Sequence, residues 1–134
     1  MMLAASLLGQ VVGHALREWP LESIGVLSGR VPDRPDQYHE LFNIAASPTT
    51  RFAVDPNRQI KLWRALADQG SRPLVVCHSH CRIGSTPEPS TTDVDEHDPS
   101  LLMMIIGLQA PMTPDVRVYR ITDDQAVRVE VTIE

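Results

Sequence analysis

A short apolar run that ends in two histidines constrains this chain more than any other segment. The run Leu74–Cys77 leads directly into His78, Ser79 and His80. Such a run is typical of a buried β-strand. Side chains alternate between the two faces of a strand, so we expect the imidazoles of His78 and His80 to lie on the same face.

The residues that follow this strand return a carboxylate toward the histidines. A loop rich in Gly, Pro and Ser, residues 81–89, precedes the motif Ser90-x-x-Asp93. Two imidazoles on one strand face, together with an oxygen ligand from a loop, match the three protein ligands of an open catalytic zinc site, whose fourth position is kept for water. The sequence therefore predicts a zinc hydrolase with His78, His80 and Asp93 as ligands.

A His-x-His pair alone is a weak signal, because it also fits two surface histidines on a strand. The loop that ends in Ser-x-x-Asp strengthens the metal interpretation. Other zinc templates are absent, since the chain has no His-Glu-x-x-His and no Pro-Cys-x-x-Cys. It also has Arg82 where the metallo-β-lactamase-like pattern His-x-His-x-Asp-His requires aspartate.

Length and composition indicate one globular domain spanning residues 1–134, with 43% hydrophobic and 22% charged residues. The net charge of −5 argues against nucleic acid and anionic membranes as partners, since both require a basic surface. Residues 1–12 are apolar but lack the basic start of a signal peptide and are too short to cross a bilayer. The only cysteines, Cys77 and Cys81, are too close together to act as a useful disulfide staple. We therefore expect a cytoplasmic protein.

The order of apolar and turn patterns predicts an α/β fold, with a mixed sheet and helices on both sides. Helices are expected at residues 4–19, 56–69 and 90–98, the second with Asp55 as N-cap and Gly70 after its end. Its buried stripe should contain Ile60, Trp63, Leu66 and Ala67. Strands are expected at residues 21–29, 38–45, 74–80, 101–108, 116–121 and 127–133, with the first two antiparallel and the last two forming a hairpin.

Three residues in these elements have plain structural interpretations. His14 falls between the apolar positions of the first helix and should be solvated. Glu22 stands at the start of the first strand, and taken alone it is best interpreted as an exposed boundary residue. Cys77 should be part of the core.

A zinc hydrolase needs two further groups near the metal. A carboxylate has to accept a proton from water and later protonate the leaving amine. A donor such as a serine hydroxyl can stabilise the developing oxyanion. Ser90 fits the donor, and Glu22 is the best carboxylate from elsewhere in the chain, although spacing alone does not select it.

Three motifs together resemble the JAMM (MPN-plus) metallopeptidase family in its compact prokaryotic form. They are Glu22 in Glu-x-x-Gly-Val-Leu-x-Gly, His78-Ser-His80, and Pro-Ser90-x-x-Asp93. The likeness covers essentially the whole chain. It implies the deaminase-like three-layer α-β-α fold with a mixed curved sheet. It also implies Zn2+ bound by the two histidines and the aspartate, Glu22 as general base and acid, and Ser90 as oxyanion donor.

The resemblance also implies a substrate. The run Gln59–Asp68 is closest to actinobacterial members that release cysteine from the C-terminus of a ubiquitin-like sulfur-carrier protein ending in Gly-Gly. We therefore expect a zinc-dependent peptidase or isopeptidase that hydrolyses an amide at such a C-terminus, by water activated at zinc with help from Glu22. The carrier's tail should bind extended along a sheet edge.

Two alternatives are less favoured. One is a JAMM peptidase of the phage-tail or cell-wall type, acting on another peptide. The other is a non-catalytic scaffold of the MPN type, which would lack the ligands that this chain contains. The sequence leaves the oligomeric state open, and a homodimer is one option.

Three features depart from the family pattern or add to it. Nine residues separate His80 from Ser90, two more than usual, and because lengthening a loop costs little we expect the ligands to stay together. Cys81 could bind the metal as a thiolate, but it should face away from the histidines if the strand continues. His97 follows Asp93 by four residues and could share its helix face, although a solvated acidic face is the simpler interpretation.

Overall fold

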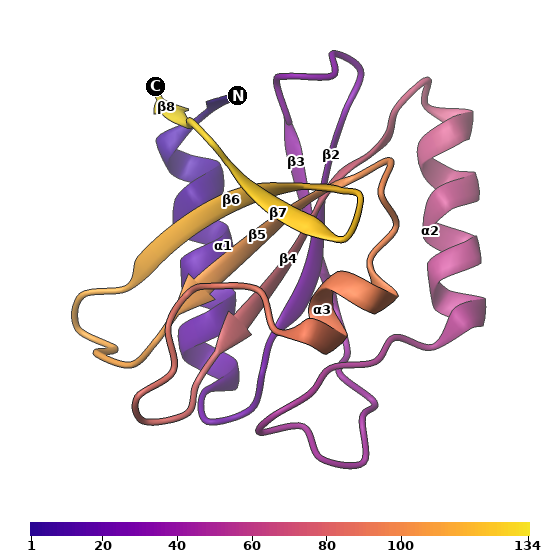
Figure 1. Ribbon diagram of the computed structural model, residues 1–134. Coiled ribbons are helices and arrows are strands. Elements are labelled where there is room, and N and C mark those ends of the chain that lie inside the picture. Colours follow the sequence, from indigo (N-terminus) through magenta and orange to yellow (C-terminus); the bar gives the residue numbers. More distant parts are fainter.

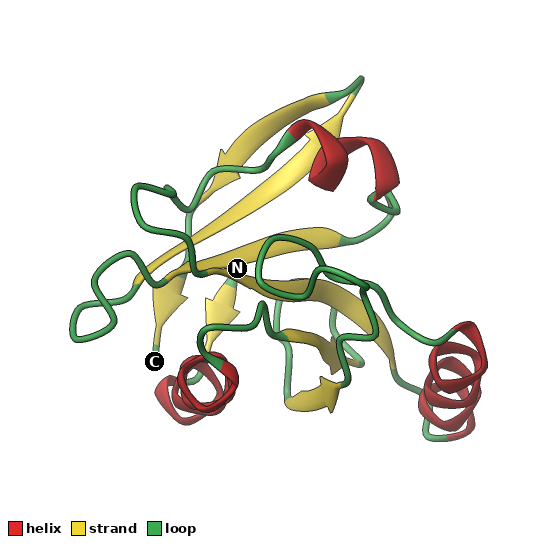
Figure 2. Cartoon of the chain, turned by 90° about the horizontal axis from the view of Figure 1, so that it is seen from below, coloured by secondary structure: helices red, strands yellow, loops and turns green.

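The structure is a computed structural model that describes residues 1–134, and a six-stranded mixed sheet forms its centre (Figure 1). The helices are α1 (Ala5–Glu18), α2 (Pro56–Asp68) and α3 (Thr91–Glu96). The strands are β1 (Met2–Leu3), β2 (Ile24–Gly29), β3 (Gln37–Leu41), β4 (Arg72–His80), β5 (Leu102–Gly107), β6 (Asp115–Thr122), β7 (Gln125–Val129) and β8 (Thr132–Ile133). Figure 2 shows α1 on one side of the twisted sheet and α2 and α3 on the other. The predicted three-layer arrangement is confirmed.

The sheet has the order β3-β2-β4-β5-β6-β7. Only β4 and β5 pair in parallel, and all other neighbours in this sheet are antiparallel. A parallel pair needs a crossover connection, and here α3 and its flanking loops provide it. This connection is what carries the chain from the end of β4 back over the sheet.

The face covered by α1 holds the larger core. Leu7, Val11 and Ala15 of α1 pack in one buried cluster with residues of the sheet, among them Cys77, whose predicted core position is confirmed. The prediction for His14 was wrong, because this residue is buried and its Nδ1 lies 2.7 Å from the Tyr38 hydroxyl. A hydrogen bond to a partner from β3 satisfies the imidazole there, which the helical pattern could not reveal.

The opposite face is packed less completely. Its buried cluster contains Met103, Ile105, Tyr119 and Ile121, with Val94 of α3 against it. The predicted buried stripe of α2 was largely wrong, since Leu66 is its only buried residue and Ile60 is 48% exposed. Within the sheet, α2 packs chiefly against β4, so most of its apolar side stays partly open.

Several local signals are confirmed. The Asp55 side chain accepts a hydrogen bond from the Asn57 backbone N–H at the start of α2, and Gly70 after its end has a φ of +68°. The predicted terminal hairpin ends earlier than expected, because β8 leaves it and pairs in parallel with β1. None of the three helices has the length and apolarity that a membrane crossing requires.

Candidate active site

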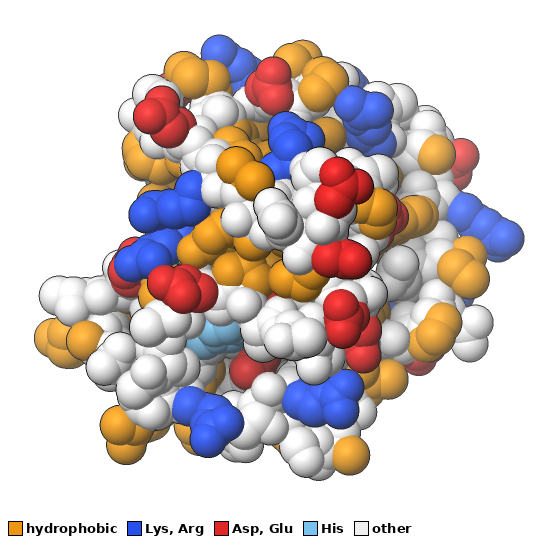
Figure 3. All heavy atoms as spheres, viewed as in Figure 1, with side chains coloured by type: hydrophobic (Ala, Val, Ile, Leu, Met, Phe, Trp, Pro, Cys, Tyr) orange, Lys and Arg blue, Asp and Glu red, His pale blue; other side chains and the backbone are white.

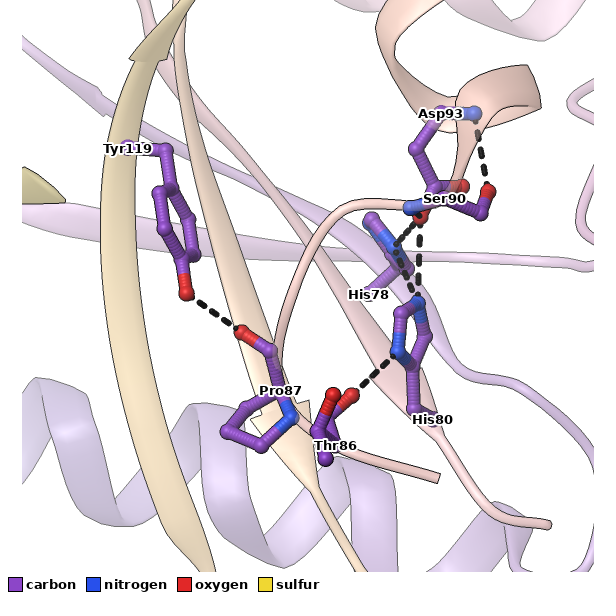
Figure 4. Close-up of polar contacts among 7 residues, drawn as sticks. All are labelled: His78, His80, Thr86, Pro87, Ser90, Asp93 and Tyr119. Carbon is purple, nitrogen blue, oxygen red and sulfur yellow. Dashed lines mark hydrogen bonds and ion pairs between the residues drawn. The ribbon is translucent and has the colours of Figure 1, made fainter. Parts of the chain in front are cut away.

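The side chains of His78, His80 and Asp93 converge at the end of β4 (Figure 4). The two histidines lie on the same strand face, with their Nε2 atoms 3.2 Å apart. The Oδ2 atom of Asp93, from α3, lies 3.2 Å from His78 Nε2 and 3.1 Å from His80 Nε2. The predicted ligand atoms are therefore brought together, although their elements are connected through a long loop.

The spacing of these three atoms fits a metal ion. Ligand atoms held about 2.0–2.1 Å from tetrahedral zinc lie roughly 3.3–3.4 Å from one another, close to the distances observed. The His80 Nδ1 lies 2.8 Å from the Thr86 carbonyl oxygen and is therefore the donor nitrogen of this imidazole. In a neutral His80 the Nε2 lone pair then faces the Asp93 Oδ2 lone pairs, and the two atoms repel each other. A cation bound between these two atoms would turn the repulsion into attraction.

The electrostatics of the group keep the carboxylate charged and act in opposite directions on the two imidazoles. Burial lowers the pKa of His78, whose side chain is fully buried. Burial also lowers the pKa of His80, but hydrogen bonds to Asp93 and to the Thr86 carbonyl outweigh it and leave that pKa raised. Burial opposes ionisation of Asp93, yet the hydrogen bonds to both histidines hold its pKa well below the usual range. The carboxylate is thus a permanent anion at neutral pH.

A capping box fixes Asp93. The Ser90 hydroxyl accepts the Asp93 backbone N–H at 3.0 Å, and the Ser90 backbone N–H donates to Asp93 Oδ2 at 2.9 Å. The carboxylate oxygen that faces the histidines is therefore held in place by the start of α3. In this arrangement the Ser90 hydroxyl acts as an acceptor, and its hydrogen makes no hydrogen bond within the protein.

The loop between His80 and Ser90 is anchored at two points. The Thr86 carbonyl accepts from His80, and the Tyr119 hydroxyl donates to the Pro87 carbonyl at 2.8 Å (Figure 4). Pro87 also lies so close to Gly107 that a Cβ there would come within 3.1 Å of it. These anchors lead the chain back to His78 and His80 in spite of the two extra residues.

Glu22 is buried, with 5% of its surface exposed, so the interpretation as an exposed boundary residue was wrong. Its backbone N–H donates to the Pro48 carbonyl at 2.7 Å, and its carbonyl accepts from Asn43 Nδ2 at 2.9 Å. Burial raises the pKa of Glu22 to about 7, with a lowering influence from His80 and a raising one from Asp93. A carboxyl of this pKa can both accept and donate a proton near neutrality.

The sequence interpretation missed Asn43. Its Nδ2 also donates to the Arg51 carbonyl at 2.8 Å, and its Oδ1 accepts from the backbone N–H groups of Ala45 and Ala53. One side chain thus joins the segment of Glu22 to the loop at residues 45–53. An Asn after a strand marks a turn, but nothing in the pattern shows that it ties two distant segments together.

Cys81 and His97 lie outside the converging group. The Cys81 sulfur lies 3.5 Å from Ser79 Oγ and 3.4 Å from the Leu21 carbonyl oxygen, and the side chain packs against the core on the α1 side. It faces away from the histidines, as predicted. The His97 Nε2 lies 2.8 Å from the Leu101 carbonyl oxygen, so this imidazole closes the turn after α3.

Comparison with known proteins agrees with this geometry. The family of prokaryotic homologs of the JAB domain matches residues 4–122. The CysO-cysteine peptidase of Mycobacterium tuberculosis is 33% identical over 135 residues, covering 99% of this chain and 90% of that protein. A probable TtuB-protein conjugate cleaving protease of Thermus thermophilus is 30% identical over 125 residues, covering 93% and 78%. The solution structure of DSY2949 from Desulfitobacterium hafniense has a TM-score of 0.85 at 28% identity, covering 100% of this chain and 93% of that one.

The family match includes all three helices and the sheet from β2 to β6. It confirms the resemblance and the fold that the motifs in the sequence implied. Both relatives are named for cleaving a covalent bond, one as a peptidase and one as a protease. The chain is therefore a hydrolase of the prokaryotic JAB-domain family.

Proposed function

We propose that this chain is a zinc-dependent peptidase or isopeptidase that hydrolyses an amide at the C-terminal Gly-Gly of a small ubiquitin-like or sulfur-carrier protein. The convergence of His78, His80 and Asp93 supports this most directly, together with a buried Glu22 whose carboxyl feels the charges of His80 and Asp93. The names of the relatives, one of which is a CysO-cysteine peptidase, support the class of substrate. We further propose that residues 1–134 form one catalytic domain.

The ligand set favours zinc. Two imidazole nitrogens and one carboxylate oxygen are a common zinc donor set in hydrolases, and they leave one position open. A zinc ion held there would lower the pKa of water and polarise the substrate carbonyl. The capping box that fixes Asp93 would keep the third ligand oriented.

Glu22 moves protons in the proposed reaction. It accepts one proton from water while the water oxygen forms a bond to the carbonyl carbon. It then delivers that proton to the amide nitrogen as the carbon–nitrogen bond breaks, so that the products are an amine and a carboxylic acid, which releases its own proton at neutral pH. Its pKa of about 7 suits both directions of transfer.

Ser90 donates to the developing oxyanion in this proposal. Its hydroxyl oxygen already accepts the Asp93 backbone N–H, so the hydroxyl hydrogen is free to point toward the substrate carbonyl oxygen. Because the same residue also holds the Asp93 carboxylate, the donor and the ligand keep a fixed relation to each other. Such preorganised donors are typical of acyl-transfer sites.

The test uses a carrier protein of the same organism that ends in Gly-Gly and has cysteine joined to it by an amide bond. Mass spectrometry of the products should show the free carrier. The variant Glu22→Gln should keep about one zinc per chain and lose turnover by about 10²–10⁴-fold. Glu18→Gln, on α1 and partly exposed, is the matched control and should retain activity.

Intact adduct after incubation with the zinc-loaded protein would exclude the proposed substrate. Full activity of Glu22→Gln would remove Glu22 from the proton transfer.

A further inference from the structure

Two hollows adjoin the converging side chains, and they differ in charge. The larger, about 240 Å3, lies between α2, α3 and the sheet and is lined mainly by apolar side chains. Its charged residues are Asp93, Glu96 and Asp98, without Lys or Arg. The smaller, about 170 Å3, shares Asp93 and Glu96 with the larger one but is also lined by Arg51. Phe52 also lines both hollows.

The smaller hollow is suited to an anion. Arg51 is the only basic residue that lines it, Glu96 is paired with Arg51, and hydroxyl groups come from residues 50, 90 and 92. Asp93 lines it as well, so the hollow reaches the metal-binding group. Figure 3 shows, on the face seen in Figure 1, a hollow in which a histidine and an acidic side chain are visible and Lys or Arg side chains stand at the border.

The backbone of Arg51 is held by hydrogen bonds, whereas its side chain forms an ion pair that another carboxylate could replace. Its N–H donates to the Ser47 carbonyl at 3.0 Å, and its carbonyl accepts from Asn43 Nδ2 at 2.8 Å. The guanidinium lies 3.5 Å from a Glu96 carboxylate oxygen, in a pair that is mostly exposed. Exposed pairs of this kind are weak, so a substrate carboxylate can replace Glu96 there. The contact also shows that the Arg51 guanidinium can pair with a carboxylate at the wall of the hollow.

The chemistry of the substrate decides which hollow the leaving group enters. When the leaving group is a single amino acid, its α-carboxylate is separated from the scissile nitrogen by one carbon and lies within about 5 Å of the scissile carbonyl. A hollow that adjoins His78, His80 and Asp93 is therefore within its reach. The larger cavity offers this carboxylate only acidic charged side chains, whereas in the smaller hollow Arg51 can bind it through two parallel hydrogen bonds.

We propose that Arg51 binds the free α-carboxylate of the amino acid that hydrolysis releases, which makes this chain selective for carriers bearing one terminal amino acid. This inference rests on the proposed function and narrows its substrate class. A carrier joined to a lysine side chain within a protein presents no carboxylate at this distance. Arg51 is thus a specificity-determining residue that favours terminal amino acids over such conjugates.

The test compares two leaving groups that differ only in charge. The substrates are the carrier joined to cysteine and the same carrier joined to cysteinamide, and kcat/KM is measured for wild type, Arg51→Gln and Arg82→Gln. Arg82 is an exposed arginine on the neighbouring loop that lines neither hollow, so it controls for general charge effects.

Wild type should prefer the cysteine substrate by about tenfold to hundredfold, as expected for a charge-assisted hydrogen-bond pair. Arg51→Gln should lose that preference through a lower kcat/KM on cysteine, with the amide substrate nearly unchanged. Arg82→Gln should keep the preference.

Equal cleavage of both substrates by wild type, or an equal loss on both in Arg51→Gln, overturns the role of Arg51 and leaves the proposed function standing. Cleavage of neither substrate overturns both.

Discussion

The two faces of the sheet are packed to different degrees. On the α1 side, thirteen buried hydrophobic residues form one continuous cluster. On the α2 and α3 side the cluster has four, and a cavity of about 240 Å3 remains beside it. The converging group of His78, His80 and Asp93 belongs to this second side.

Strand β4 joins the two faces. Val75 and Cys77 point into the α1 core, while His78 and His80 point to the opposite side, because side chains alternate along a strand. A rigid core on one face therefore positions the histidines on the other. We infer that the stability of this fold depends mainly on the α1 side and that its chemistry depends on the other side.

The largest expected effect comes from removing the histidines. His78→Ala with His80→Ala should abolish zinc binding and reduce activity at least about 10⁴-fold, since both the activation of water and the polarisation of the carbonyl depend on the metal. The α1 core does not contain these side chains, so the double variant should still unfold cooperatively. Metal analysis, the activity assay and thermal unfolding check the three statements.

His39→Ala is the control for the double variant. His39 pairs with Ser28 on the β3 edge, with Nε2 and Oγ 2.8 Å apart, so this variant should keep zinc. Loss of the fold in the double variant would contradict the separation of the two faces.

The next largest effect should be on stability, and it is tested by truncating one apolar side chain on each face of the sheet. Leu27→Ala removes a fully buried side chain from the α1 core and should lower the free energy of unfolding by about 2–5 kcal/mol. Ile60→Ala truncates an α2 residue that is 48% exposed and should change it by less than about 1 kcal/mol. Urea titration at constant zinc measures both.

The activity of Leu27→Ala and Ile60→Ala provides a second test. Below the unfolding transition, Leu27→Ala should keep its turnover per folded molecule, because Leu27 belongs to the α1 core and the converging group lies on the opposite face of the sheet. Similar destabilisation by both truncations would refute the difference in packing between the faces.

Much of this architecture could be predicted because its signals are local. The apolar run before His78 predicts a buried strand, and Ser90-x-x-Asp93 predicts a capped helix, since strand alternation and capping involve neighbouring residues only. Asp55 before Pro56 predicts the start of α2 for the same reason. These signals and the resemblance together led to the predicted ligands.

The remaining features depend on contacts between distant segments. The burial of His14 follows from a Tyr38 hydroxyl on another element, and the burial of Glu22 from a segment that Asn43 ties down. The apolar residues of α2 predict a buried stripe, but how closely a helix approaches its sheet is decided by the rest of the fold. Ile60 is exposed for that reason.

A smaller effect should appear in the pH dependence of stability after zinc has been removed by chelation. The pKa of Glu22 is raised from 4.5 to about 7 in the folded protein by burial. Between these values the folded state holds a proton that the unfolded state has released. The contribution of Glu22 to stability is therefore greatest below pH 4.5 and decreases as the pH rises to 7.

Other groups change their protonation in the same pH range. The contribution of Glu22 is therefore isolated by comparing wild type with Glu22→Gln. Burial lowers the pKa of His78 and of His14, and their contributions rise with pH where that of Glu22 falls. The free energy of unfolding of wild type minus that of Glu22→Gln should fall by at most about 3 kcal/mol from pH 4.5 to pH 8. Parallel curves for the two proteins would show that burial does not perturb Glu22.

The smallest effect concerns the cap of α2. This helix has few buried residues, so its stability depends more on local interactions than that of α1 does. Asp55→Ala removes the acceptor for the Asn57 backbone N–H and should destabilise the helix by about 1 kcal/mol. Asp55→Ser keeps an acceptor and should restore most of the loss.

Hydrogen exchange can locate this effect. Because α2 packs loosely, the loss of its cap should speed exchange of the α2 amides several-fold and leave the β4 and β5 amides unchanged. A weakly packed helix can open without disturbing the strand that bears the histidines. Faster exchange throughout the sheet would show instead that α2 is part of the same cooperative unit as the α1 core, and the two faces would then differ in packing but not in stability.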